Sequence, residues 1–324
     1  MLGTSLIVMQ SPTGEQFDIR HGAARAIITE VGATLRLFES AGVPYTETFG
    51  EQDKPPSGCG NILIPWPNRT GGARWTFEGE TQHLEHTEPQ RGNAIHGLVR
   101  HVPWTVLERE EAAIELGVEI GVQPGWPVPL DTTIRYEVSE DGLRVTHTVR
   151  NIGERAVSFG VGAHPYVKAG PVSNSDCDLR LAARMHLQLD QDRMLPLGAP
   201  EPVRGTRYDL HSRRRLFCEI VSEGDLDDCF TDCAAGTDRR FHHRLTHPRG
   251  GVELWTDRDF RWVQVFTPDH FAGKPSAAIA IEPMTCPPDA LNSGVDLLTV
   301  APGERWSGSW GIRPLSVGRS STGA

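Results

Sequence analysis

Four polar side chains that can carry a charge or move a proton lie at Gly- and Pro-rich junctions, where functional groups concentrate in folded proteins. They are Arg69 in Pro65-Trp66-Pro67-Asn68-Arg69-Thr70-Gly71-Gly72, His96 in Asn93-Ala94-Ile95-His96-Gly97, His164 in Gly160-Val161-Gly162-Ala163-His164-Pro165-Tyr166, and Glu282 in Ile281-Glu282-Pro283. His164 and Glu282 both follow alternating apolar runs and precede a proline, which restricts their backbones. A carboxylate and an imidazole held together supply a proton acceptor and a proton donor near neutral pH. Each residue alone also fits a purely structural role at a strand end.

The segments that must position these residues repeat with a period of two, which predicts strands with one buried face. Apolar residues alternate with polar ones or glycine from Ile114 to Val122, and residues 134–138 and 143–149 repeat the pattern around a turn at 140–142, as in a hairpin. Shorter runs of the same kind are found at residues 157–163, 252–254, 279–281 and 306–312. No long amphipathic helix is evident, so the sequence predicts an all-β protein.

Many short alternating runs, punctuated by 34 Gly and 24 Pro, favour an antiparallel sandwich of large sheets over a βαβ architecture. No shift in composition marks a linker, so we expect a single domain over residues 1–315. Residues 190–215 are rich in Pro and Arg, which predicts a long irregular connection. Residues 316–324 are rich in Ser and Gly, and we expect a flexible tail there.

The charge of the chain excludes several classes of partner. A formal net charge of −10 argues against general affinity for nucleic acid or an anionic membrane surface, both of which require a dense positive face. The apolar run Leu6–Met9 lacks the flanks of a secretion signal, and no segment approaches the length of a membrane span. We therefore expect a cytoplasmic protein, a monomer or homodimer, with six reduced cysteines.

One group of cysteines and histidines loosely matches the spacing of a zinc site. It consists of Cys229, Cys233, His242, His243 and His247. Cys229 precedes Phe230 in an apolar segment, where cysteine usually acts as a small hydrophobic residue. We therefore expect neither a metal nor another cofactor.

Taken together, five segments in order resemble the aldose 1-epimerase (galactose mutarotase) family, over about residues 58–292. The family's Asn-Arg and Phe-x-Gly segments are similar to Asn68-Arg69-Thr70-Gly71-Gly72 and Phe77-Glu78-Gly79, and its Asn-x-Leu-His-Gly segment is similar to Asn93-Ala94-Ile95-His96-Gly97. Its second histidine matches His164, close to Tyr166, and its Tyr-Asp-x-x-Phe segment resembles Leu226-Asp227-Asp228-Cys229-Phe230. Its glutamate followed by Pro-Asp-Ala-x-Asn resembles Glu282 and Pro288-Asp289-Ala290-Leu291-Asn292.

The resemblance implies a galactose-mutarotase-like β-sandwich and the interconversion of α and β anomers of a sugar. It also implies that Glu282 is the general base and His164 the general acid. Arg69 and His96 would be hydrogen-bond donors to the substrate, and Asp227 would bind a sugar hydroxyl. Trp66 and Tyr166, which lie near these motifs, could provide an aromatic wall for the sugar, although core packing explains them equally well.

The chain departs from the family at Leu98, Ala163, Pro165 and Pro283-Met284, which surround the catalytic pair without removing it. The reaction is therefore expected to be retained, whereas the substrate stays open between a neutral hexose and a phosphorylated or otherwise anionic sugar. Arg74, Arg91 and Arg100 could bind such an anion through bidentate contacts, or serve as ordinary surface charges. A sugar-binding protein without turnover is the remaining alternative.

Overall fold

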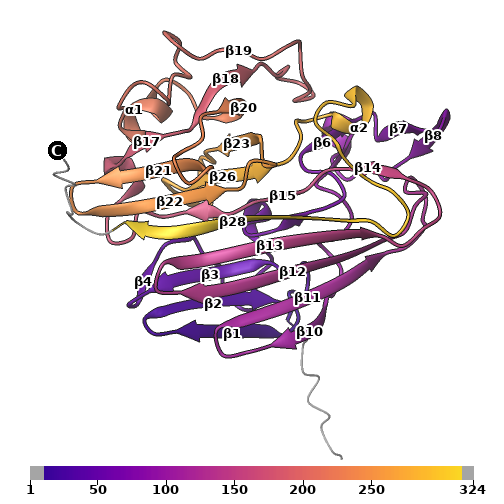
Figure 1. Cartoon of the computed structure of the whole chain (residues 1–324). Coiled ribbons are helices and arrows are strands. Elements are labelled where there is room, and N and C mark those ends of the chain that lie inside the picture. Colours follow the sequence, from indigo (N-terminus) through magenta and orange to yellow (C-terminus); the bar gives the residue numbers. More distant parts are fainter. Residues whose placement is uncertain (1–10, 316–324) are drawn as a thin grey trace, which may run out of the picture.

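The computed structural model describes residues 11–315. The apolar run Leu6–Met9 and the expected flexible tail at residues 316–324 lie outside the described residues. The protein is built almost entirely from antiparallel strands, in two eight-stranded sheets and several smaller ones (Figure 1). The prediction of an all-β protein built from large antiparallel sheets is confirmed.

The first large sheet has the order β10-β11-β12-β13-β28-β22-β21-β17. Its strands are β10 (Thr105–Arg109), β11 (Ala113–Ile120), β12 (Leu130–Ser139), β13 (Gly142–Asn151), β28 (Arg305–Leu315), β22 (Gly250–Thr256), β21 (Phe241–His247) and β17 (Asp178–Arg180). The predicted hairpin forms between β12 and β13, where Ser139 pairs with Gly142 across a two-residue turn. The strand predicted from Ile114 to Val122 corresponds to β11, which ends two residues earlier.

The second large sheet has the order β19-β18-β20-β23-β26-β15-β5, with β16 also paired to β26. Its strands are β19 (Glu201–Pro202), β18 (Ala183–Leu187), β20 (Asp227–Cys233), β23 (Trp262–Phe266), β26 (Ile279–Met284), β15 (Gly162–Ala163), β5 (Ile62–Leu63) and β16 (Tyr166–Val167). Every residue of β26 is buried, which explains its nearly continuous apolar sequence. Glu282 is the one charged residue in that strand, and it is buried like the others.

Smaller sheets complete the structure. A four-stranded sheet of β1 (Gln16–His21), β2 (Ala24–Thr29), β3 (Leu35–Ser40) and β4 (Val43–Pro44) contacts β11, β12 and β13. Four pairs of strands are β6 (Arg69–Gly71) with β9 (Asn93–Ile95), β7 (Arg74–Phe77) with β8 (Glu80–His83), β14 (Val157–Phe159) with β27 (Leu298–Val300), and β24 (His270–Phe271) with β25 (Lys274–Pro275). The apolar run at 157–163 thus divides between two sheets, as β14 and β15.

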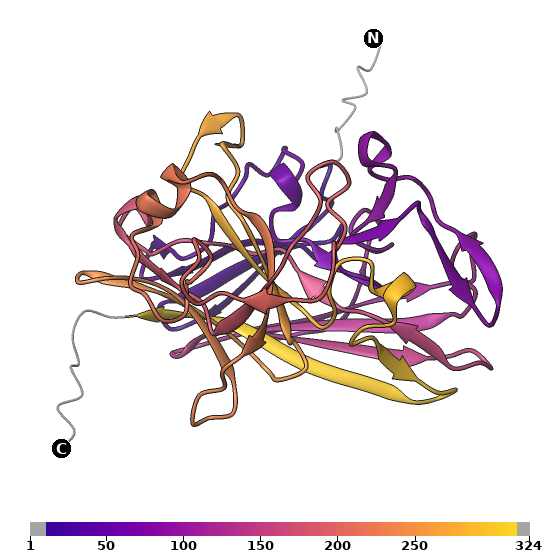
Figure 2. The same cartoon turned by 90° about the horizontal axis from the view of Figure 1, so that it is seen from above.

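Helices are few and short. They are α1 (Phe217–Ser222), α2 (Ala290–Ser293) and three 3₁₀ turns, Pro56–Gly58, Pro89–Arg91 and Asn174–Asp176. Within the described residues, no helix has the length and apolar character needed to cross a membrane. Figure 2 shows α2 beside the purple segment that carries β6 and β7, and Asp289 fixes this contact by accepting a hydrogen bond from Gly71 N at 2.8 Å.

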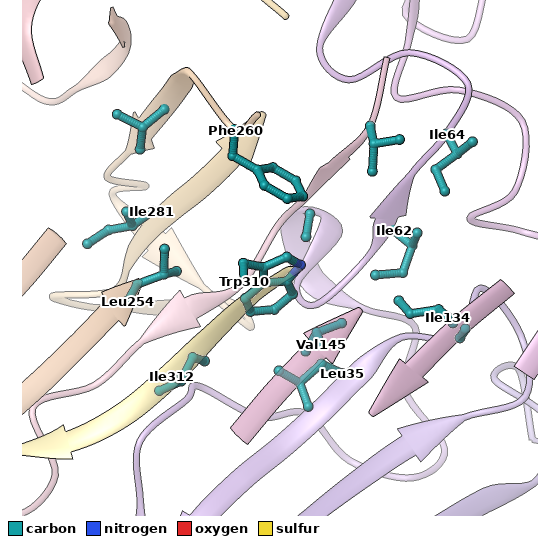
Figure 3. Packing of buried hydrophobic residues seen from close by; sticks show 14 of the residues in the cluster. Leu35, Ile62, Ile64, Ile134, Val145, Leu254, Phe260, Ile281, Trp310 and Ile312 are labelled. Atoms are coloured by element: carbon teal, nitrogen blue, oxygen red, sulfur yellow. The ribbon is translucent and has the colours of Figure 1, made fainter. Parts of the chain in front are cut away.

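The hydrophobic core lies between the sheets. Figure 3 shows Trp310 of β28 surrounded by Val145 of β13, Ile281 of β26 and Leu35 of β3, so that three sheets contribute to one cluster. Residues 190–215 form the predicted irregular connection and contain only the two-residue strand β19. The burial in this core holds β20, β23 and β26 rigidly side by side, and these strands carry the candidate site.

Candidate active site

A pocket of about 460 Å³ collects five of the seven predicted site residues. These are Arg69, His96, His164, Asp227 and Glu282. They come from β6, the turn after β9, the loop between β15 and β16, β20 and β26. Its volume is typical of a small-ligand site, and its lining is mostly polar.

The centre of the pocket is a buried carboxyl and imidazole. Glu282 and His164 are only 2% and 4% exposed, and Glu282 Oε1 lies 3.3 Å from His164 Nε2. The other carboxyl oxygen, Glu282 Oε2, is buried with no protein hydrogen-bond partner among the described residues. Buried polar atoms are almost always paired, so an unpaired oxygen at the wall of a polar pocket points to a bound ligand. The glycine at position 58 borders this pair, and a Cβ there would lie 3.3 Å from His164 Cδ2.

Burial favours the neutral form of both groups. It raises the pKa of Glu282 well above its ordinary value, and the nearby Asp227 charge raises it further. It lowers the pKa of His164 to about 3. The two shifts therefore favour a protonated Glu282 carboxyl beside a neutral His164 imidazole. Residue types alone predict an ionised carboxylate beside a protonated histidine, and burial acts against that combination.

His96 is held in one orientation by a strained turn. Its backbone adopts φ 65°, followed by Gly97 at φ 68°, where a Cβ would lie 2.1 Å from the carbonyl oxygen of Ile64. The Nδ1 atom of His96 accepts a hydrogen bond from Asn68 N at 3.2 Å, so the proton of the neutral ring is on Nε2. Burial lowers the pKa of His96 well below its ordinary value, and His164 and two arginines add to this effect. His96 is therefore a neutral donor.

Arg69 is fixed by a carboxylate that the sequence analysis did not identify. Its Nε and Nη2 donate to Glu88 at 2.9 and 3.0 Å, and both side chains are 9% exposed. Arg69 Nη2 also lies 3.8 Å from Asp227 Oδ2. Burial raises the pKa of Asp227, whereas the charge of Arg69 acts in the opposite direction. No pattern in the sequence connects Arg69 to Glu88, because the two residues meet through the pairing of β6 with β9 and through the turn that returns Glu88 to Asn93.

Two other residues were not predicted from the sequence: Gln264, which holds a pocket residue, and Phe266, which lines the pocket. Gln264 Nε2 donates to Asp227 Oδ1 at 2.6 Å and holds that carboxylate in place. Phe266 lines the pocket and is its aromatic wall. A signal for Gln264 was present, since it is the single polar residue in Trp262-Val263-Gln264-Val265-Phe266, a strand buried at four of its five positions.

The expectation that Trp66 and Tyr166 form an aromatic wall for the sugar is not supported by their positions. Trp66 is 2% exposed and packs in the core, 6.3 Å between ring centroids from Trp126. Tyr166 is completely buried behind His164, with the two rings stacked at 5.2 Å. The aromatic groups of the motif therefore support the site from behind, and Phe266 contacts the pocket instead.

The cysteines and histidines considered for zinc do not assemble. Cys229 and Cys233 lie on β20 of the second sheet, whereas His242, His243 and His247 lie on β21 of the first. Among residues 11–315, one group has ligand atoms within 4.8 Å of one another, namely His96, His164 and Glu282. These three could hold a divalent cation, so activity measurements need a control with a chelator.

The pKa shifts predict an unusual pH dependence. Because the pKa of His164 is lowered to about 3, the imidazole does not take up an additional proton from solution until the pH is far below 6.5. Because the pKa of Glu282 is raised, the pair keeps its proton above the ordinary carboxyl range. We expect kcat/KM, corrected for the spontaneous rate, to stay constant within about threefold from pH 7 to pH 5. A fall in activity centred near pH 6.5 would contradict this protonation scheme.

The comparisons with known proteins agree with this geometry. The aldose 1-epimerase family profile matches residues 15–313. The chain is 26% identical over 293 residues to the uncharacterised protein YihR of Escherichia coli K12, covering 90% of this chain and 91% of that one. It is 24% identical over 282 residues to galactose mutarotase of Homo sapiens, covering 81% and 79% of the two chains.

Solved structures show the same fold. A galactose mutarotase-like protein from Clostridium acetobutylicum superposes with a TM-score of 0.79 at 18% identity, covering 92% of this chain and 94% of that one. Galactose 1-epimerase from Lactobacillus acidophilus gives 0.77 at 16% identity, covering 92% and 93%. Together with the family profile over nearly the whole chain, these matches show that this protein belongs to the aldose 1-epimerase family.

Proposed function

We propose that the protein is a cofactor-independent aldose 1-epimerase that interconverts the α and β anomers of a sugar. The observation that carries the proposal is the buried Glu282–His164 pair, with an unpaired carboxyl oxygen at the wall of a polar pocket. Anomer exchange needs a proton acceptor and a proton donor within one sugar ring's reach, and this pair contains both.

The reaction begins when the proton of the Glu282 carboxyl moves to His164. With the proton on His164, ionised Glu282 accepts the proton of the C1 hydroxyl while the C1–O5 bond breaks and the C1–O1 bond becomes a carbonyl. His164 gives its proton to the departing ring oxygen, so the open-chain aldehyde is neutral. The pair is then a carboxylic acid beside a neutral imidazole, which is the form that burial favours. Rotation about C1–C2 and the reverse transfers close the ring as the other anomer.

The surrounding groups suit the charge changes in this reaction. His96 presents its Nε2 proton and Arg69 its guanidinium, as donors for sugar oxygens on which negative charge develops. Asp227, held by Gln264, accepts hydrogen bonds from hydroxyls at the far side of the ring. The fixed orientation of all three groups lowers the cost of binding and of reorganisation.

Polarimetry tests the proposal directly. Pure α anomers of glucose and galactose are dissolved with and without the protein, in the presence of a chelator, and the approach to the equilibrium rotation is followed. We expect the protein to accelerate the exchange of at least one sugar well above the buffer rate. Sugar binding without acceleration would instead indicate a non-catalytic binding protein.

A second candidate, an epimerase of anionic sugars, is favoured by one specific observation. A cavity of about 400 Å³ shares Gly58 and Arg100 with the candidate active site, and Lys54 and His101 also line it. Burial lowers the pKa of Arg100, a cost that a bound anion would offset. Of the three arginines considered for anion binding, Arg100 lines this cavity, whereas Arg74 and Arg91 do not.

The anionic alternative gives a separate prediction. If the substrate is phosphorylated, an Arg100→Gln variant should lower kcat/KM for hexose 6-phosphate at least tenfold more, about 1.4 kcal/mol, than it lowers that for free hexose. Arg74→Gln, at an exposed position on β7, is the matched control. Faster exchange of free hexose than of hexose 6-phosphate by wild type would reject this alternative.

A further inference from the structure

A second cavity continues the candidate active site. It has a volume of about 580 Å³ and shares two residues, Asp227 and Phe266, with the catalytic pocket. We call it the outer pocket. It is bounded by the start of β20, by residues 267–270 after β23 and by the irregular connection at residues 189–208. Its volume exceeds what one small polar group needs and falls within the range of ligand sites.

The strand register places the boundary between the two pockets on the side away from the reacting carbon. Asp227 pairs with Phe266 across β20 and β23, and Gln264 pairs with Glu282 across β23 and β26. Two strand spacings of about 4.8 Å, together with the two-residue offset between Gln264 and Phe266 along β23, therefore separate the backbone of Asp227 from that of Glu282. A sugar ring with C1 at Glu282 extends across β23 toward Asp227. A substituent on its far side then passes Phe266 and enters the outer pocket.

The chemistry of the outer pocket suits hydroxyl groups and disfavours an anion. Asp225, Asp228 and Asp269 provide carboxylate acceptors along its wall. The two arginines of the wall use part of their donor capacity within the protein, since Arg91 Nη1 donates to the carbonyl oxygens of Gln191 and Asp192 and Arg207 Nη2 donates to that of Gly224. With Asp227, the aspartates of the wall outnumber these two arginines. A phosphate or sulfonate would face the carboxylates, whereas a neutral sugar can donate its hydroxyl hydrogens to them.

Part of the wall is rigid before any ligand binds. His186 Nε2 lies 2.7 Å from Asp228 Oδ1, and the His186 ring stacks on Tyr208 with 3.7 Å between centroids. The lining also includes exposed Gln191 and His270, whose flexible polar side chains can adapt to a ligand. An acceptor that is held in place before binding reduces the entropy cost of binding.

From these observations we propose that the outer pocket is a subsite for a second, neutral sugar unit, so that the preferred substrate is a reducing disaccharide or longer oligosaccharide. The reducing-end unit occupies the catalytic pocket with its C1 hydroxyl free. The second unit is attached through an oxygen on the far side of the first ring. The inference rests on the proposed function for its reaction, but the binding it requires can be measured separately.

The test compares mono- and disaccharides in a protein that binds without turnover. Calorimetry with the Glu282→Gln protein uses glucose, maltose, cellobiose, lactose, isomaltose and melibiose, which sample 4- and 6-linked second units. We expect at least one disaccharide to bind at least tenfold more tightly than glucose. Equal or weaker binding of all five disaccharides would overturn the subsite, whether or not the protein is an epimerase.

Blocking the outer pocket should remove this preference. Gln191→Trp, at an exposed position in the wall, should cut disaccharide affinity and kcat/KM at least tenfold while changing glucose values less than twofold. Asp192→Trp, at the exposed neighbour outside the wall, is the matched control, and Asp269→Ala tests the acceptors without added bulk. Equal losses for glucose and disaccharide in Gln191→Trp would contradict the inference. Disaccharide preference in binding without acceleration of any sugar would retain the subsite and reject the epimerase.

Discussion

Replacing Glu282 by Gln is expected to lower the accelerated rate of anomer exchange about 10²- to 10⁴-fold, equivalent to about 3–5 kcal/mol of transition-state stabilisation. The amide keeps the size of the side chain and removes both the proton acceptor and the shared proton. His164→Gln should have a similar effect. Because the two groups act as one unit, the double variant should lose little more than either single variant. Polarimetry of all three proteins measures these effects.

The same substitution is expected to leave the fold intact or make it more stable, which separates chemistry from unfolding. The folded protein keeps a proton on Glu282 at pH values where the unfolded chain has released it, so ionisation favours unfolding as the pH rises above the ordinary carboxyl range. Glu282→Gln should therefore equal or exceed the wild-type Tm at pH 7, with the difference shrinking toward pH 4. Glu119→Gln, exposed on β11, is the control. Full activity in Glu282→Gln would reject the proposed mechanism.

Removing Arg69 is expected to cost about 3–5 kcal/mol of unfolding free energy, because Glu88 would remain buried without its bidentate partner. Both side chains are 9% exposed, so Glu88 would keep little contact with solvent in the folded protein. Urea denaturation of Arg69→Ala and wild type measures the difference. The exposed pair Arg184–Asp232 supplies the control, since its side chains are 51% and 49% exposed. Arg184→Ala should cost about 1 kcal/mol or less.

A double variant separates the buried charge from the lost packing. In Arg69→Met combined with Glu88→Leu no uncompensated partner charge remains from this pair, so part of the stability should return. Asn93 and Arg91 also contact Glu88, at 3.3 and 3.5 Å, so the recovery should be incomplete. If Arg69→Ala cost no more than Arg184→Ala, the Arg69–Glu88 pair would not be a structural support of the site.

Local patterns were sufficient to predict the sheets and several site residues. Alternation over 114–122 and across the hairpin around Glu140 gave the strands and their turn, because the pleat places successive side chains on opposite faces whatever the rest of the chain does. Motif order then suggested that His164 and Glu282 act together, although 118 positions separate them. Only the pairing of β15 and β16 with β26 shows how those positions come within reach.

The interpretation of the aromatic residues failed for an identifiable reason. Trp66 and Tyr166 lie close to site residues in the sequence, but Trp66 and His164 are outside the strands, where spacing along the chain does not fix the direction of a side chain. Trp66 packs on Trp126 and Tyr166 stacks behind His164. Phe266 is the aromatic residue at the pocket. It belongs to none of the sequence motifs and reaches the site because it pairs with Asp227 across β20 and β23.

The sequence by itself determined the all-β architecture, the family and most of the polar groups of the site, because these depend on residue type, short-range periodicity and motif order. The tertiary structure decided the burial and contact of Glu282 and His164, the ion pair of Arg69 with Glu88 and the junction of the catalytic and outer pockets. Burial shifts a pKa and opens a cavity only when strands distant in the chain pack together, and no local pattern encodes that packing.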